Sequence, residues 1–144
     1  MSSLKSSAAR KTFKINIPSQ LDYEKIPIAA VGIIAQKMGF SAERVETLKT
    51  AMGEAVTNAI EHGNQHSAGT RVFIEIAMEL DALVISVIDQ GVKPFVDIPT
   101  QRVDRPDNRG WGWQWINDFT DEVIVEVKPG RNEIRMIAYV NKER

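Results

Sequence analysis

Three polar side chains recur every four residues in a segment whose other positions are typical of a buried helix. The segment GEAVTNAIEHGN spans residues 53–64 and places Glu54, Asn58 and His62 at these intervals. Because an α-helix turns once every ~3.6 residues, positions four apart stack on one face. On such a ridge a carboxylate can accept a proton, and an amide oxygen can bind a metal ion. For a helix considered alone, however, ordinary solvated residues are the more frequent explanation.

Two further motifs favour a ligand cleft over a solvated ridge. Asp89 and Gly91 follow a buried strand, where the carboxylate is held at the strand end and the glycine lets a ligand approach the backbone. The sequence RGWG at 109–112 opens a helix, and its glycines expose backbone N–H groups at the positive end of the helix dipole. That arrangement cradles phosphate. Each motif alone is weak evidence, but together and in this order they are specific.

Hydrophobic periodicity and turn residues predict the elements that position these motifs. Strands are expected at 13–18, 71–78, 83–88, 122–128 and 133–140, and helices at 21–38, 41–63 and 112–119. We expect a bend at Pro27, an N-cap at Ser41, and helix ends at Gly39 and Gly63. Residues 90–109 lack periodicity and predict a long loop, of a kind that is usually functional or mobile. This order predicts an α+β fold with helices on one face of a mainly antiparallel sheet.

The composition indicates one domain without disulfides, thiolate metal sites or a membrane span. The chain has 144 residues, of which 43% are hydrophobic and none is cysteine, which fits a reducing, cytoplasmic location. The longest apolar stretch, 26–35, is interrupted by Pro27 and Gly32 and is too short to cross a bilayer. Residues 1–12 are predicted to be a disordered, basic, serine-rich tail, and 13–144 the domain. The few charges of such a tail are usually solvated, so we expect no membrane partner and no direct nucleic-acid partner.

The three motifs together resemble those of the GHKL, or Bergerat-fold, ATPases. The resemblance is closest to the small anti-sigma factor serine kinases of bacterial stress and sporulation switches. Residues 54–62 look like the N box of that family, Asp89-Gln90-Gly91 like its first glycine box, and Gly110-Trp111-Gly112 like its second. The resemblance covers 13–140 and implies a Bergerat α/β sandwich. We expect no phosphoacceptor helix, and hence neither a sensor histidine kinase, a mismatch-repair ATPase nor a chaperone.

The resemblance implies a site for ATP and Mg²⁺ with residues in named roles. Asp89 would accept a hydrogen bond from the adenine amino group, and Gly91 would let the base lie against the backbone. Asn58 would hold Mg²⁺, and Glu54 would be the catalytic general base. The loop 92–109 would form a lid, in which Arg102, Arg105 and Arg109 are available to neutralise phosphate charge. The other residues assigned to nucleotide binding are His62, Gly110, Trp111 and Gly112; for His62 a structural role stays equally open.

The chain departs from the family pattern at three places. Lys93 replaces a second glycine of the first glycine box, which changes adenine packing or lid hinging and narrows the resemblance to the anti-sigma subgroup. Asn132 stands where relatives commonly have a threonine near the adenine. Trp111, Trp113 and Trp115 occupy positions that are mostly aliphatic or small in relatives. We expect at least one of these tryptophans to pack in the core, whereas an exposed one would indicate a partner surface.

The resulting prediction is an ATP-dependent protein serine/threonine kinase that acts as an anti-sigma factor in a bacterial partner-switching pathway. It would bind a sigma factor in one state and phosphorylate a small anti-anti-sigma antagonist protein in the other. A homodimer is expected by resemblance. The alternative is a non-catalytic ATP-binding module of the same switch. The presence of both Glu54 and Asn58 favours the enzyme, because a pure binding module does not need them.

Overall fold

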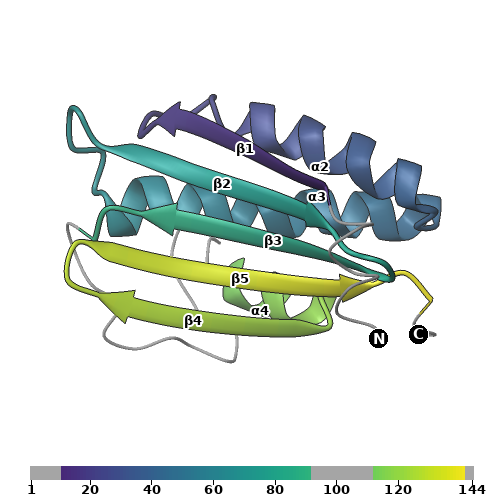
Figure 1. The fold of residues 1–144 in the computed structure, drawn as a ribbon. Helices are drawn as coiled ribbons and strands as arrows, with labels where there is room; N and C mark the ends of the chain where they lie inside the picture. The colour runs from purple at the N-terminus through teal and green to yellow at the C-terminus, as the bar shows by residue number, and fades with distance from the viewer. Residues whose placement is uncertain (1–10, 92–111, 142–144) are drawn as a thin grey trace.

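The computed structural model describes residues 11–91 and 112–141, which form one sheet with helices on one of its faces (Figure 1). The strands are β1 (Lys11–Pro18), β2 (Arg71–Met78), β3 (Ala82–Asp89), β4 (Glu122–Lys128) and β5 (Arg131–Tyr139). The helices are α2 (Lys25–Met38), α3 (Ala42–Asn58), the π-helix η1 (Ala59–Gly63) and α4 (Gly112–Phe119). The predicted element order and the predicted α+β fold are confirmed. Residues 1–10 of the predicted tail and 92–109 of the predicted lid lie outside the described residues.

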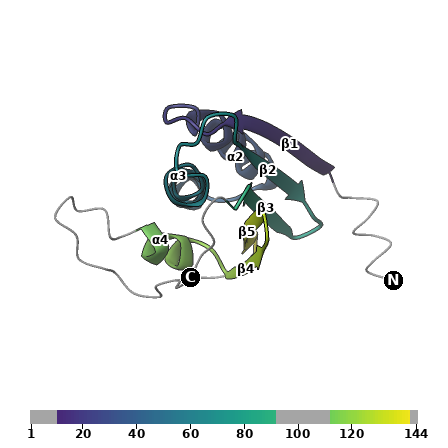
Figure 2. The ribbon, with the colours of Figure 1, turned by 90° about the vertical axis from the view of Figure 1, so that its left-hand side faces the viewer.

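The sheet has the strand order β1-β2-β3-β5-β4, and every neighbouring pair is antiparallel. Seen from the end in Figure 2, α2, α3 and α4 lie on the same side of the sheet. The strand register aligns Ile76, Ile85 and Met136 in one row across the central strands, and all three are fully buried. Successive strand residues point to opposite faces of the sheet, and only the face under the helices is covered. The buried row therefore lies on the helix side. The core therefore fills the space between the sheet and the helices.

Local signals explain where α2 begins and ends. The segment before Lys25 forms turns, so α2 starts later than the expected residue 21. Pro27 falls in the first helical turn, where no helical hydrogen bond needs its missing N–H. The proline therefore does not bend the helix, as we expected, but lies at its start. Gly39 ends α2 in the left-handed conformation with φ +95°, and Ser41 Oγ caps α3, as predicted. Within the described ranges, no helix is both long and apolar enough to span a membrane.

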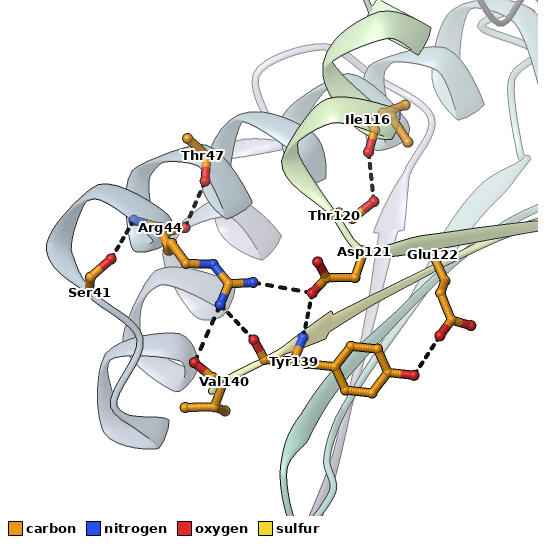
Figure 3. Close-up of polar contacts among 9 residues, drawn as sticks. All are labelled: Ser41, Arg44, Thr47, Ile116, Thr120, Asp121, Glu122, Tyr139 and Val140. Carbon is orange, nitrogen blue, oxygen red and sulfur yellow. Dashed lines mark hydrogen bonds and ion pairs between the residues drawn. The ribbon is translucent and has the colours of Figure 1, made fainter. Parts of the chain in front are cut away.

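A largely buried ion pair ties the first turn of α3 to the segment between α4 and β4 (Figure 3). Arg44 Nη2 lies 3.3 Å from Asp121 Oδ2, and only 1% of the Asp121 side chain is exposed. Arg44 Nη1 donates to the carbonyl oxygen of Tyr139 at 2.5 Å, and the Tyr139 N–H donates to Asp121 Oδ2 at 2.7 Å. The guanidinium also lies 4.7 Å from the centre of the Phe40 ring. These contacts hold α3, the end of α4 and the end of β5 in one arrangement.

We predict that Asp121→Ala lowers the free energy of unfolding by about 3 kcal/mol, because it leaves a largely buried guanidinium without its carboxylate. The measurement is urea denaturation followed by circular dichroism. Glu46→Ala is the control, since it breaks the exposed pair between Glu46 and Lys49, whose side chains are 71% and 35% exposed. That change should cost less than about 1 kcal/mol. Equal losses in the two variants would contradict the role given to the buried pair.

Candidate functional site

The last turn of α3 brings together two of the three predicted ridge residues. Glu54 and Asn58 lie four residues apart in regular α-helix, and both are partly buried. After Asn58 the backbone continues as the π-helix η1, in which the Asn64 N–H bonds to the Ala59 carbonyl at 2.8 Å. A π-turn bonds residue i to i+5, so the strict four-residue stacking stops at Asn58. His62 lies exposed in η1, outside the pair formed by Glu54 and Asn58.

The side-chain amide of Asn58 has the environment expected of a ligand. Its Nδ2 atom is buried and has no hydrogen-bond partner among the described residues. Buried polar atoms are nearly always paired, so an exception requires an explanation such as a bound group. Among the described residues there is no group of three or more His, Asp or Glu side chains that could hold a metal ion. The Nδ2 group can only donate, so the group it suits is an acceptor such as a phosphate oxygen. The metal-ligand role of the Asn58 carbonyl oxygen stays a prediction.

The N-terminus of α4 lies directly against this turn of α3. A Cβ atom added to Gly112 would lie 2.7 Å from Glu54 Oε1 and 3.9 Å from Asn58 Nδ2. The close atom is the end of the flexible Glu54 side chain, so a larger residue here would mainly displace that carboxylate. The Glu54 carboxylate lies at the positive end of the α4 dipole, where a negative charge is stabilised. It therefore occupies the end of α4 at which the sequence predicts phosphate binding.

Asp89 ends β3 as a buried carboxylate with 2% of its surface exposed. Its Oδ1 atom accepts hydrogen bonds from the Gly91 N–H at 2.7 Å and from Asn132 Nδ2 at 2.9 Å. Burial raises the pKa of Asp89, and these donors oppose that shift because they favour the charged form. The Oδ2 atom lies against η1, where a Cβ on Gly63 would be only 2.0 Å away. The carboxylate is thus held by Oδ1, with Oδ2 directed toward the end of the N-box helix.

The glycines at 63 and 91 have structural roles that the sequence did not specify. Gly63 is the last residue of η1, so the helical segment ends there as expected, and the glycine also provides the close contact with Asp89. Gly91 has φ +63°, and a Cβ there would lie 2.6 Å from the Arg131 nitrogen. The turn after β3 therefore packs on the turn between β4 and β5. Room for a base against Gly91 stays a prediction.

Sequence reasoning missed Asn64, which connects the N-box segment to three strands. Asn64 is fully buried, and its Nδ2 donates to Ser19 Oγ at 2.8 Å and to the Arg71 carbonyl at 2.9 Å. Its Oδ1 accepts the Gln90 N–H at 2.8 Å. These bonds hold the end of η1 to the end of β1, the start of β2 and the turn after β3. The available signal was a polar residue directly after Gly63, in a segment that otherwise supplies the core.

The described tryptophans support the expectation that at least one packs in the core. Trp113 packs on the hydrophobic core from α4, and Trp115 is partly buried. Other residues that were assigned roles or noted as departures lie outside the described residues. These are Lys93, Arg102, Arg105, Arg109, Gly110 and Trp111.

Comparison with known protein families gives one match that covers most of the chain. Residues 17–138 match a family model described as a histidine kinase-like ATPase domain. The matched range contains the N-box segment, the Asp89 turn, α4, the strands β2, β3 and β4, and β5 except for Tyr139, but only Ile17 and Pro18 of β1.

This chain matches curated relatives over most of their length. A serine-protein kinase RsbW from Bacillus licheniformis is 31% identical over 139 residues, which span 88% of this chain and 84% of that protein. An anti-sigma F factor from a Thermoanaerobacter species is 30% identical over 139 residues, spanning 91% and 95% of the two chains. The RsbW of Bacillus subtilis is 28% identical over 142 residues, spanning 91% and 87%.

Solved structures share the fold at lower identity. The RsbU and RsbW domains of Rv1364c from Mycobacterium tuberculosis superpose with a TM-score of 0.68 and 16% identity, covering 92% of this chain and 33% of that one. A blue-light activated histidine kinase domain from Erythrobacter litoralis gives a TM-score of 0.56 and 15% identity, covering 95% and 69%. These two structures establish the common architecture.

We predict that Gly63→Ala destabilises the protein by roughly 3 kcal/mol, because the new Cβ would displace the buried Asp89 carboxylate. Thermal unfolding followed by calorimetry measures the loss. Gly32→Ala is the matched control in a helix, since its Cβ would meet only the flexible Lys49 side chain, at 3.1 Å from Cδ. Helix propensity should make that change neutral or stabilising by up to about 1 kcal/mol. The same sign and size for both variants would refute the Gly63 contact as a constraint.

Proposed function

Because the chain belongs to the histidine kinase-like ATPase family, we propose that it is an ATP-dependent protein serine/threonine kinase and an anti-sigma factor in a partner-switching pathway. The observation that carries the proposal is the placement of Glu54 and Asn58 four residues apart on α3, where the buried Asn58 Nδ2 has no hydrogen-bond partner among the described residues. Relatives named as serine-protein kinases and as an anti-sigma factor, which this chain matches over most of their length, support the predicted class of enzyme.

The adenine end of ATP belongs at the turn after β3 in this proposal. An ionised carboxylate can only accept hydrogen bonds, and the adenine amino group can donate one. Since Asp89 Oδ1 already receives two donors, Oδ2 is the atom assigned to the amino group. Gly91 brings the backbone close to the β4–β5 turn and presents no side chain to the base.

The reacting end of the nucleotide belongs at Asn58 and Glu54. The Asn58 carbonyl oxygen would hold Mg²⁺, which when bound neutralises negative charge on the phosphates. The hydroxyl oxygen of the acceptor serine or threonine attacks the γ-phosphorus, and its proton passes to a carboxylate oxygen of Glu54. The bond between the γ-phosphorus and the bridging oxygen breaks, and ADP leaves. Glu54 must turn from the α4 N-terminus toward the hydroxyl to take this role.

The proposed partners are a sigma factor in one state and a small anti-anti-sigma protein, the phosphorylation substrate, in the other. Sigma factors act in the cytoplasm, so the proposal includes that location. It also includes a homodimer, and the sheet face opposite the helices is available for one. No described element covers that face, on which Arg131 and Arg135 pair with Glu133 at 3.0 and 3.1 Å, and Ile124 is 41% exposed.

The second candidate is a partner-switching module that binds ATP and its partners without phosphotransfer. The departure at Asn132 and the position of Glu54 against α4 are compatible with that alternative. Only a transfer assay separates the two functions, because both predict ATP binding and sigma factor binding.

We predict that ATP binding depends on Mg²⁺ and that Asn58→Ala removes most of this dependence. The variant should bind MgATP at least roughly tenfold more weakly, because one charge-assisted contact is lost. Isothermal calorimetry with and without Mg²⁺ measures the effect. Asn141→Ala, at an exposed position beyond β5, is the matched control and should leave the affinity unchanged. Equal ATP affinity with and without Mg²⁺ in the wild type would remove the metal assignment.

We predict that Glu54→Gln retains ATP binding and sigma factor binding but transfers phosphate ~100-fold to 10,000-fold more slowly, the usual contribution of a general base. Radiolabel transfer from ATP to a candidate antagonist measures the rate, beside a pull-down of the sigma factor. Glu43→Gln, which changes an exposed carboxylate in the first turn of the same helix, is the matched control and should transfer phosphate at the wild-type rate.

The outcomes of that assay separate the two functions. If the wild type binds ATP and its partner but labels no antagonist, the kinase proposal fails and the binding module replaces it. If Glu54→Gln labels as fast as the wild type, the kinase stands but Glu54 is not its base, and Glu61 or a residue of the predicted lid becomes the next candidate.

A further inference from the structure

A second buried amide lies directly opposite Asp89 in the sheet. The β3–β5 register pairs Asp89 with Asn132, and Asn132 is 1% exposed. Its Nδ2 atom donates to Asp89 Oδ1 at 2.9 Å. The family resemblance leads us to expect a threonine here, so the amide is a departure of this sequence from that pattern.

We propose that Asn132 is a positioning residue that sets the base selectivity of this chain by keeping Asp89 a hydrogen-bond acceptor. The inference rests on the proposed function, in which Asp89 receives the amino group of adenine. Asn132 itself does not contact the base in this proposal, and its effect passes through the Asp89 carboxylate.

The argument begins with the two forms of a buried carboxyl group. An ionised carboxylate accepts hydrogen bonds at both oxygens, whereas a protonated one also donates and can then bind a carbonyl group. Burial alone favours the protonated form. Donors to the carboxylate favour the ionised form, in which Oδ2 can only accept. They are the Gly91 N–H and Asn132 Nδ2, both on Oδ1, together with the backbone N–H of Asn132. A base with an amino group at position 6 then matches Oδ2, and a base with an oxo group there does not.

The choice of an amide makes this constraint stricter than a hydroxyl would. An amide NH₂ group can only donate, whereas a threonine hydroxyl rotates and can either donate or accept. Gly91 packs on the Gly130–Arg131 backbone, where an added Cβ would lie 2.6 Å from the Arg131 nitrogen. Both donors to Oδ1 therefore come from segments that contact each other, and the carboxylate is fixed between them.

The test compares ATP with inosine triphosphate, which has an oxo group in place of the amino group at position 6. Competition binding gives the ratio of the two affinities. Asn132→Leu and Asn132→Ala both remove the donor, and in either variant that folds the ATP preference should fall about tenfold, the effect of one charge-assisted hydrogen bond. Asn132→Thr retains a donor and should restore part of the preference.

A double-mutant cycle shows whether the effect passes through Asp89. In the Asp89→Ala background, Asn132→Leu should change the ratio no further. Asn64→Leu is the control, because it disrupts a buried amide that bonds to the Gln90 backbone and not to the Asp89 carboxylate. This variant should weaken the binding of both nucleotides equally and leave the ratio of their affinities unchanged.

Two results would overturn the inference. One is a ratio in the Asn132→Leu or Asn132→Ala variant equal to that of the wild type, and the other is an equal change with and without Asp89. Failure of the nucleotide site itself, on which both candidate functions rest, looks different, because the wild type would then bind neither nucleotide. Failure of phosphotransfer alone would leave the ratio of the two affinities, and this inference, untouched.

Discussion

The contact between Gly63 and Asp89 is the constraint on which the candidate site depends. The N-box segment approaches the end of β3 so closely that a single methyl group at residue 63 would lie 2.0 Å from the Asp89 carboxylate. Core packing alone does not require this, since apolar side chains on a helix normally keep it farther from a sheet. The close approach brings the helix that carries Glu54 and Asn58 next to the strand that carries Asp89. Two motifs that are far apart in the sequence thereby lie side by side in the candidate site. The hydrogen bond from the Gln90 N–H to Asn64 Oδ1 joins the same two segments.

Buried amides and one buried ion pair fix this arrangement from several sides. Asn64 bonds to the turn after β3 from the helix side, and Asn132 bonds to Asp89 from β5. At the other end of α3, Arg44 bonds to Asp121 and to the end of β5. Such buried polar groups add little net stability, because each hydrogen bond mainly repays the cost of removing its partners from water. Their directional geometry, however, admits fewer arrangements than apolar packing does, so they specify where α3 lies on the sheet.

The fold was largely predictable because its signals are local. The predicted bounds of β2, α4 and β4 agree with the structure, and the caps at Gly39 and Ser41 follow from residue type and position. The sequence patterns of an α-turn and a π-turn are nearly the same, so η1 was not foreseen and His62 was grouped with the ridge. The partners of Asn64 and Asn132 come from other strands and depend on sheet register, which no local pattern encodes. The predicted family is confirmed, whereas the ligand roles of the site residues stay predictions.

The two ends of the proposed nucleotide site differ in how firmly they are held. The base end is bounded by strand ends and buried hydrogen bonds that connect Asp89, Gly91 and Asn132. At the phosphate end, the flexible Glu54 side chain lies against the first glycine of α4. A preorganised base end makes selection of the base independent of how that side chain is placed. In the proposed function, entry of the triphosphate and transfer of phosphate both depend on the placement of Glu54, whereas recognition of the base does not.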